Sequence, residues 1–415
     1  MTPSEQIDSR RASATFRSLG TSGEIWLCAD ACLELRPASS ACARCRDACP
    51  VKAFAWTVEG VRLNPGCTGC GQCAAVCPSG AIRVAGFEPE KLQSATQRIE
   101  CRCLPEPLAG DAARVSCLGG LSPTLLLSLA AGTQVPWQLV DRGWCASCPA
   151  GDGAAFVAAE AVEVAGLLLD ALGVAKARHP LVASEPLPVS IARPLVNASD
   201  GASVSRRGFF GAFVRQAVAA AETAVTEQLP VKADRGGCRP SPVIQLQRKR
   251  FSADLHQLAQ EAGGAVPASF FPSLEIAEHC FHHGMCAAVC PSGALRLYED
   301  EPASLAGLEF DAQICVACGL CVRQCPSGAI RLLPAGNEGA VAVSGMQRLT
   351  NNTQKICTEC AASFVGMGSD DLCPRCRTDR NLAVSIFGTL LADKQVSEGN
   401  FNEQYSATSI EGGRS

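Results

Sequence analysis

Apolar residues in this chain of 415 residues come in short runs, which predict short strands and helices. Near the start, residues 53–56 and 61–63 flank Glu59-Gly60, a pattern that predicts a β-hairpin with glycine at the turn. Later apolar runs predict a strand, a helix, a second strand and a second helix at 114–116, 124–131, 135–140 and 154–172. This order indicates a small α/β unit, whose bounds we set at 99–178.

The two ends of the chain lack such a pattern. Residues 1–23 contain Arg10, Arg11 and Arg17 but no hydrophobic stretch, so we expect a disordered leader and no secretory signal. Residues 395–415 are polar, and we expect a disordered tail.

We expect residues 179–278 to connect the α/β unit to the second cysteine-rich half and not to form a hydrophobic core of their own. Residues 179–204 are rich in proline and lack periodicity, which predicts an extended linker. Residues 205–278 are expected to be a helical connector with one helix at 251–262. The basic run Arg248-Lys249-Arg250 before that helix is expected to be solvated.

Composition narrows the class of protein. The chain has 26 cysteines, and their grouping in CxxC pairs is typical of metal sites in an intracellular protein rather than of disulfides. A net charge of −4 and a pI near 5.8 argue against a surface that binds nucleic acid. No apolar run approaches the ~18 residues of a membrane-spanning helix. We therefore expect a soluble protein of the cytoplasm.

Two copies of one cysteine motif dominate the sequence. Residues 67–83 read CTGCGQCAAVCPSGAIR, and residues 315–331 read CVACGLCVRQCPSGAIR. Both contain CxxCxxCxxxCP, the spacing with which three thiolates hold one [4Fe-4S] cluster while the fourth reaches a neighbouring cluster. A zinc site or a disulfide pair is the alternative interpretation, but the repetition favours iron–sulfur clusters.

Residues 24–86 resemble the two-cluster bacterial ferredoxins, because the run Cys42-Ala-Arg-Cys45-Arg-Asp-Ala-Cys49-Pro50 precedes the first complete motif. The resemblance implies a pseudo-symmetric fold in which two hairpins and two short helices enclose a pair of clusters. It assigns one [4Fe-4S] cluster to Cys49, Cys67, Cys70 and Cys73.

The other cluster of this module departs from the ferredoxin pattern. The resemblance assigns to it three thiols, those of Cys42, Cys45 and Cys77. Ser39 occupies the position of the remaining cysteine. Cys32 is our candidate for the fourth ligand and Cys28 is its alternative. A three-iron or incomplete cluster, with both residues as plain buried thiols, is the third interpretation.

Residues 279–334 repeat this arrangement. One [4Fe-4S] cluster is assigned a complete set, Cys290, Cys315, Cys318 and Cys321. The other is assigned Cys280, Cys286 and Cys325, with His283 at the position of the fourth ligand. A histidine ligand would raise the reduction potential relative to four thiolates. A three-iron cluster, or a ligand from Cys238, is the alternative. The parallel departures indicate an internal duplication.

Five more cysteines lie in the predicted α/β unit, namely Cys101, Cys103, Cys117, Cys145 and Cys148. The strings VSCLGGLSP at 115–123 and GWCASC at 143–148 resemble the delta subunit of methyl-viologen-reducing hydrogenases, which implies a [2Fe-2S] cluster. The CxC pair stands where that family has CxxC, so the choice of four ligands among five thiols stays open. A structural zinc site, or a redox-active dithiol at Cys145 and Cys148, is the alternative.

The string SRRGFF at 205–210 stands ahead of the second ferredoxin-like run. Such a start followed by a ferredoxin resembles the accessory ferredoxins of periplasmic nitrate reductase, which implies a fusion of an upstream cluster protein with an accessory module. The alternative is an amphipathic helix with two solvated arginines.

Residues 348–394 contain two CxxC pairs separated by twelve residues, formed by Cys357, Cys360, Cys373 and Cys376. Two such pairs on hairpins close a tetrahedral site of four sulfurs, which suits zinc or a single iron. We favour zinc in a zinc-ribbon-like knuckle.

The predicted fold class is α+β and multidomain, with two ferredoxin-like dicluster modules, an α/β cysteine-containing module between them and the C-terminal knuckle. No set of acid, base and nucleophile is found in the sequence, so no catalytic residue is assigned and enzyme activity of its own stays open. We expect a multi-cluster electron-transfer protein or subunit that serves a partner oxidoreductase, molybdenum-dependent or hydrogenase-like. The alternative is an accessory ferredoxin that matures a molybdenum-type metalloenzyme or delivers clusters to it.

Overall fold

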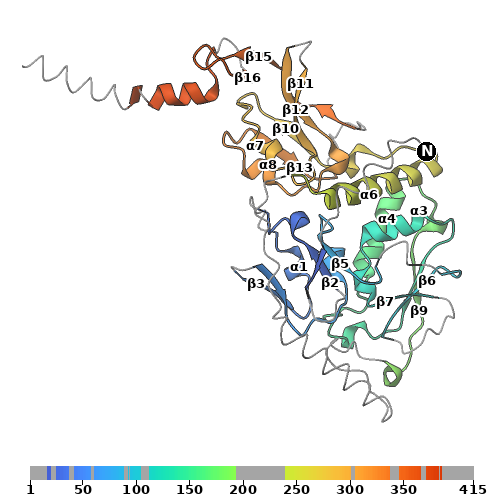
Figure 1. Ribbon diagram of the computed structural model, residues 1–415. Helices are drawn as coiled ribbons and strands as arrows, with labels where there is room; N and C mark the ends of the chain where they lie inside the picture. The colour runs from blue at the N-terminus through green and yellow to red at the C-terminus, as the bar shows by residue number, and fades with distance from the viewer. Residues whose placement is uncertain are drawn as a thin grey trace, which may run out of the picture.

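The structure, a computed structural model, is drawn in Figure 1. It describes residues 16–19, 25–36, 42–57, 60–87, 92, 94–103, 112–192, 239–300, 304–336, 345–365, 371–382 and 384–385. Several sequence predictions lie outside these residues, namely those for the SRRGFF string, Cys238, residues 193–204 and the tail.

The first ferredoxin-like module has two antiparallel strand pairs and two helices of one turn. The predicted hairpin is formed by β3 (Phe54–Thr57) and β4 (Gly60–Leu63). The other pair joins the two ends of the module, β2 (Ile25–Cys28) and β5 (Ile82–Val84), and is therefore not the second hairpin that we expected. The helices are α1 (Arg44–Asp47) and α2 (Gln72–Ala75). Both strand pairs share one core with the buried cysteines Cys32, Cys45, Cys49 and Cys73.

The second ferredoxin-like module has the same order of elements. Its end strands are β10 (Ser273–Ile276) and β13 (Ile330–Leu333), its hairpin is β11 (Leu295–Asp300) and β12 (Leu305–Phe310), and its helices are α7 (Met285–Ala288) and α8 (Leu320–Arg323). Strand β12 also pairs with β14 (Gln347–Arg348) and β15 (Asn352–Ile356), and β15 pairs with β16 (Ser363–Val365). The C-terminal knuckle is therefore joined to this module by a shared sheet.

The middle module is a parallel sheet. Its strands are β6 (Arg98–Cys101), β7 (Ala113–Val115), β8 (Gln138–Asp141) and β9 (Leu181–Ser184), in the spatial order β7-β6-β8-β9. The connecting helices are α3 (Pro123–Ala131) and α4 (Ala159–Ala171), close to their predicted positions. Buried residues of the sheet and of both helices form its core, among them Ile99, Leu139, Leu126 and Ala165.

One long helix, α6 (Pro242–Glu261), lies between the second ferredoxin-like module and the rest of the molecule (Figure 1). Its C-terminal half contributes Leu255, Leu258 and Ala259 to a core shared with α3 and α4. Near its start, Val243 and Ile244 are buried in the core of the first module. A single helix thus holds both ferredoxin-like modules and the α/β unit in contact.

The structure corrects four predicted boundaries. Residues Phe16–Ser18 of the predicted leader form β1, which pairs with β2, and the guanidinium of Arg83 lies 4.2 Å from the centre of the Phe16 ring. Leu181–Ser184 of the predicted linker form β9, because the end of the α/β unit supplies a further parallel strand. The helix predicted at 251–262 begins at Pro242, and β10 of the predicted connector belongs to the second module.

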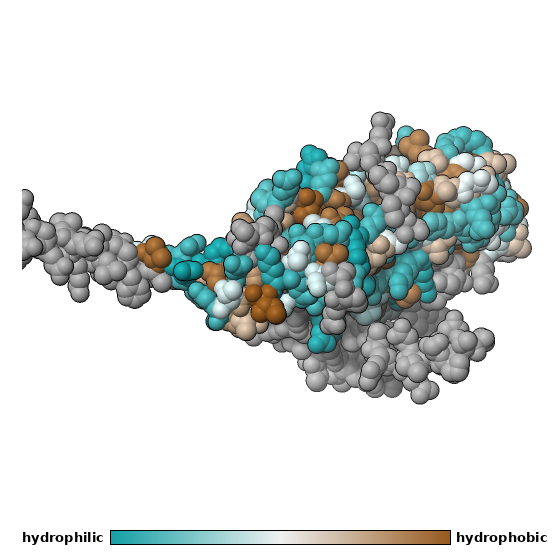
Figure 2. Space-filling view, turned by 90° about the horizontal axis from the view of Figure 1, so that it is seen from above, coloured by the Kyte–Doolittle hydropathy of each residue, from teal (hydrophilic) through white to brown (hydrophobic). Residues whose placement is uncertain are grey.

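No helix in the described ranges is both long and apolar enough to cross a membrane. The face seen from above in Figure 2 is mostly hydrophilic, with hydrophobic residues in small groups.

We expect Leu255→Ala to destabilise the protein, because Leu255 is fully buried where α6 meets α3 and α4. A cavity of this kind costs about 2–5 kcal/mol of folding free energy. Leu246→Ala on the same helix is the matched control, since Leu246 is 48% exposed and its truncation should change stability by about 0.5 kcal/mol or less. Thermal unfolding followed by circular dichroism measures both. Equal melting temperatures for the two variants would contradict the packing of α6.

Candidate iron–sulfur and metal sites

The cysteine motifs form the same local structure in both ferredoxin-like modules. Helices α2, α7 and α8 are four residues long, and they carry Cys73, Cys286 and Cys321. Each follows a glycine with positive φ, Gly71 at 85°, Gly284 at 72° and Gly319 at 71°. Glycine adopts this backbone with little strain, so each glycine allows a tight turn directly before the helix that carries the cysteine.

Site A, defined as Cys49, Cys67, Cys70 and Cys73, is brought together in the core of the first module. Burial raises the pKa of the Cys73 thiol well above its usual range, and the neighbouring thiolates of Cys70, Cys67 and Cys49 raise it further. Two backbone N–H groups donate to sulfur, that of Ala53 to Cys49 at 3.2 Å and that of Gly69 to Cys67 at 3.4 Å. Four converging sulfurs with N–H donors suit a cubane cluster.

Site B is defined as Cys32, Cys42, Cys45 and Cys77, and these four residues line one small cavity. Burial raises the pKa of Cys45 and of Cys32 to about 12 each, and Cys77 and Cys42 act on both thiols. Cys28 is not among the residues that line the cavity, and the charges that act on its thiol come from Asp30 and Arg83.

Site B also contains a buried hydrogen-bond donor, the indole N–H of Trp56, that an iron–sulfur cluster could satisfy. Trp56 lines the cavity, and its buried indole N–H has no hydrogen-bond partner in the described part of the chain. A cluster sulfide is an acceptor that would satisfy this N–H. The donor set and the cavity therefore both suit an iron–sulfur cluster.

Site C, defined as Cys290, Cys315, Cys318 and Cys321, repeats site A. Burial raises the pKa of Cys321 to about 12, and the thiolates of Cys318 and Cys290 raise it further. The sulfurs of Cys290 and Cys315 accept N–H donors from Leu295 at 3.5 Å and Ala317 at 3.4 Å. The equivalent thiols of the two modules thus have equivalent donors.

Site D contains the thiols of Cys280, Cys286 and Cys325. Burial raises the pKa of Cys286 to about 11, and the thiolates of Cys280 and Cys325 raise it further. His283, which we expected as the fourth ligand, is exposed, and its ring packs edge-on against Phe281 with centroids 5.8 Å apart. The structure therefore groups the three thiols and places His283 at the surface.

Serine hydroxyls beside the fourth cysteines are a feature that we did not predict. The hydroxyls of Ser79, Ser292 and Ser327 lie 3.6, 3.7 and 3.5 Å from the sulfurs of Cys77, Cys290 and Cys325. The signal was available in the sequence as the repeated string CPSG. Hydrogen bonds to ligand sulfurs raise the potential of a cluster, so these serines can tune three of the four sites.

Site M gathers the five cysteines of the middle module at the carboxyl ends of its strands. Cys101 ends β6, Cys117 follows β7, and Cys145 and Cys148 follow β8. In a parallel sheet of this order, the crevice beyond the strand ends where the order reverses, between β6 and β8, is the usual place for a ligand. The topology alone therefore places a binding site where the cysteines lie.

The thiols of site M interact closely. Hydrogen bonding with Cys103 and Cys117, followed by burial, raises the pKa of Cys101. The hydrogen bond with Cys101 lowers the pKa of Cys103. The thiolates of Cys117 and Cys103 also act on Cys145 and Cys148, whose pKa values are raised mainly by burial. All five predicted thiols are brought together.

A buried ion-pair network holds the loops of site M. The guanidinium of Arg142 bonds Glu100 at 2.5 Å and Glu185 at 2.9 Å, and Arg98 bonds Glu185 at 2.6 Å. Glu100 precedes Cys101, and Arg142 lies three residues before Cys145. Because a buried carboxylate without its partner is unstable, this network fixes the ends of β6 and β8 relative to each other.

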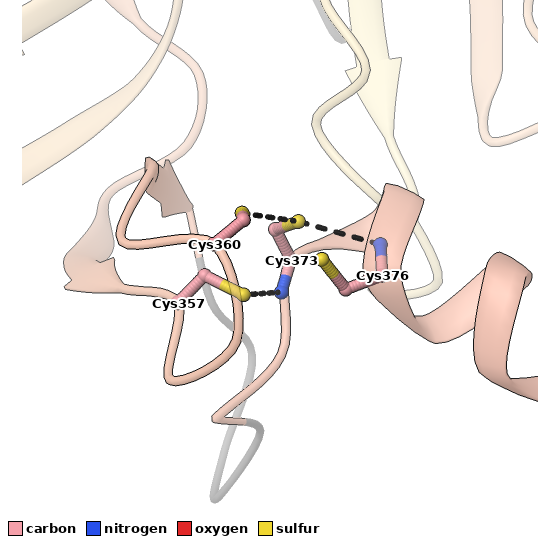
Figure 3. A group of neighbouring side chains, drawn as sticks. All are labelled: Cys357, Cys360, Cys373 and Cys376. Carbon is pink, nitrogen blue, oxygen red and sulfur yellow. Dashed lines mark hydrogen bonds between the residues drawn. The ribbon is translucent and has the colours of Figure 1, made fainter.

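The knuckle site brings Cys357, Cys360, Cys373 and Cys376 face to face (Figure 3). Their four sulfurs lie within 4.8 Å of one another, and those of Cys360 and Cys373 are 3.7 Å apart. Sulfurs on a tetrahedron with metal bonds of ~2.3 Å would be separated by about 3.8 Å. The site therefore fits one metal ion. The first pair lies in the β15–β16 hairpin, whereas the second opens a helix and not a hairpin, which corrects our expectation.

Comparison with protein families gives two matches. Residues 278–329 match the 4Fe-4S dicluster domain, and residues 66–83 match the 4Fe-4S binding domain. Comparison with curated proteins gives no match. Two ferredoxin-type iron–sulfur domains are thus present, one in each predicted module, which indicates a role in iron–sulfur electron transfer. Neither match supports the resemblances to the hydrogenase delta subunit or to the nitrate reductase accessory ferredoxins.

We expect Cys357 to be a thiolate at neutral pH in protein treated with a chelator, so that the knuckle site holds no metal. The backbone N–H of Cys373, 3.3 Å from its sulfur, lowers the pKa of Cys357 to about 6. Since the thiolate is the reactive form, alkylation by iodoacetamide should slow as the pH falls through about 6. Cys376, whose pKa is raised by hydrogen bonds with Cys373 and Cys360, is the internal control and should react only at alkaline pH. Mass spectrometry of each peptide gives both profiles. A Cys357 midpoint near the ordinary value of about 8.5 would contradict the contact.

Proposed function

We propose that this chain is a multi-centre electron-transfer protein or subunit that relays single electrons to or from a partner oxidoreductase. Sites A, B and C would each hold a [4Fe-4S] cluster, and site D would hold a [4Fe-4S] or [3Fe-4S] cluster on three thiols. Site M would hold a [2Fe-2S] cluster, and the knuckle site a structural zinc ion. The observation that carries the proposal is the convergence of buried thiols in sites A, B and C, each backed by hydrogen-bond donors.

The clusters would supply reversible one-electron chemistry, and the protein's own residues would set its conditions. Cysteine sulfurs anchor each centre, and backbone N–H groups such as those of Ala53 and Leu295 lower the charge on sulfur. The apolar core of each module keeps water away from the thiolates. Charge, hydrogen bonding and solvent exposure are the means by which a protein sets a cluster's potential.

A redox titration followed by electron paramagnetic resonance tests this role. We expect several signals that appear on reduction and disappear on reoxidation, because a relay protein keeps its clusters through the cycle. The result that contradicts the proposal is a set of labile clusters that leave the protein when an apo-acceptor protein is added. That outcome would indicate cluster delivery.

We predict that Cys32, and not Cys28, completes site B. Cys32 lines the site B cavity with the other three thiols, whereas Cys28 does not. Cys32→Ala should therefore abolish or convert one cluster, with a loss of up to about four irons per chain. Cys28→Ala is the matched control, since it removes another buried thiol four residues earlier, at the end of β2. Iron analysis and the paramagnetic spectrum compare the two variants, and an unchanged iron content in Cys32→Ala would refute the assignment.

A further inference from the structure

The first turns of α6 are bound to the second ferredoxin-like module along one face. Residues Ser241, Gln245, Arg248 and Ser252 lie at i, i+4, i+7 and i+11, so they share that face. The Ser241 N–H donates to the carbonyl of Pro291 at 2.7 Å, and the Gln245 side chain donates to that of Ser292 at 3.0 Å.

Two further hydrogen bonds on this face reach the start of site C. The Arg248 guanidinium donates to the carbonyl of Gln313 at 3.1 Å, and the hydroxyl of Ser252 donates to the Gln313 side chain at 2.7 Å. Arg248 is thus not the solvated residue that we expected, because it is held two residues before Cys315.

Another face of the same turns is bound to the first module. Val243 and Ile244 are buried in the core that contains the thiols of sites A and B. The side chain of Gln247 covers Gly80 so closely that a Cβ there would lie 2.1 Å from the Gln247 amide oxygen. Gly80 also has a positive φ of 61°. The positive φ favours glycine where the helix meets this turn.

These contacts bring two equivalent Cys-Pro-Ser-Gly turns onto one helix. The turn at 77–80 carries Cys77 of site B, and the turn at 290–293 carries Cys290 of site C. In addition, Val316 and Cys318, which belong to the loop of site C, pack directly against the core of the first module. Sites B and C are therefore neighbours across the junction of the two modules.

A second junction joins site A to site M. Cys70 of site A and Cys117 of site M share one small buried cluster with Ala150. The side chain of Gln72 donates to the carbonyl of Ala150 at 2.6 Å. A Cβ on Gly120 would lie 2.8 Å from the carbonyl oxygen of Cys70, so the two cysteine loops meet backbone to backbone.

We propose that the thiolate sites form one continuous electron path through the chain, in the order M, A, B, C, D, which crosses between the two ferredoxin-like modules at the B–C junction beside α6. The inference rests on the proposed function and adds to it the order of the centres. Each step moves one electron, so the site that loses it is oxidised as its neighbour is reduced. A one-electron donor protein at one end and a one-electron acceptor protein at the other balance the sequence.

The magnetic interaction between neighbouring reduced centres tests this order. In the fully reduced protein, the signal of site B should be split or broadened by site C. Removal of site C in the variant Cys315→Ala/Cys318→Ala should abolish that interaction. The matched control is Cys280→Ala/Cys286→Ala, which removes site D and should leave the signal of site B unchanged. A site B signal that is identical with and without site C would overturn the path.

Iron analysis and circular dichroism show whether each variant keeps its other sites and its fold. If the variant without site C does not fold, pulsed paramagnetic resonance on the wild-type protein decides instead. Faster spin relaxation of site B once site C is reduced supports the order, and unchanged relaxation contradicts it.

Failure of the proposed function can be told apart from failure of the proposed path. If no site in the wild-type protein can be reduced reversibly, the proposed function is wrong; if sites are reduced without mutual interaction, only the path is wrong.

Discussion

The structure depends on the burial of thiols in groups. A buried thiolate is unfavourable unless a positive charge compensates it, and the pKa values of Cys32 and Cys45, raised to about 12, show how strongly these sites resist ionisation when no metal is bound. Metal ions supply the missing charge and displace the protons. Helices of four residues and strands of three to six have little stability of their own. Folding of each ferredoxin-like module is therefore coupled to the chemistry of its sulfurs.

The proposed electron path also requires that the thiol sites keep fixed positions relative to one another. Helix α6 provides this, because it contacts all three modules. One face of the helix donates hydrogen bonds to the second module, one is buried in the core of the first, and its C-terminal half packs on α3 and α4. The contact with the second module includes hydrogen bonds from Gln245, Arg248 and Ser252, and the other two contacts bury apolar side chains of the helix. A helix of 20 residues can reach all three modules because it is about 30 Å long.

The cysteine spacing and the local elements could be predicted from the sequence, because both depend on residues close together in the chain. The hairpin around Gly60 and the helix at 123–131 were predicted for this reason, and the family matches support the two iron–sulfur domains. Strands β1 and β9 could not be predicted, since each is stabilised by a partner strand from elsewhere and has no periodicity of its own.

The start of α6 was missed although its signal was present, because Ser241-Pro242 is a typical helix start. The helix lacks the usual apolar pattern over its first turns, because Gln245 and Arg248 contact the second module through hydrogen bonds. For site D, spacing alone placed His283 among the ligands, whereas the structure leaves it exposed beside Phe281.

The central claim is that the cysteines of the two ferredoxin-like modules bind iron and sulfide. Its most direct test is the content of iron, zinc and acid-labile sulfide in protein purified without oxygen. The account predicts about sixteen irons in cubane clusters with a matching amount of sulfide, four of each per cluster. Protein that contains zinc in place of iron and no acid-labile sulfide would contradict it.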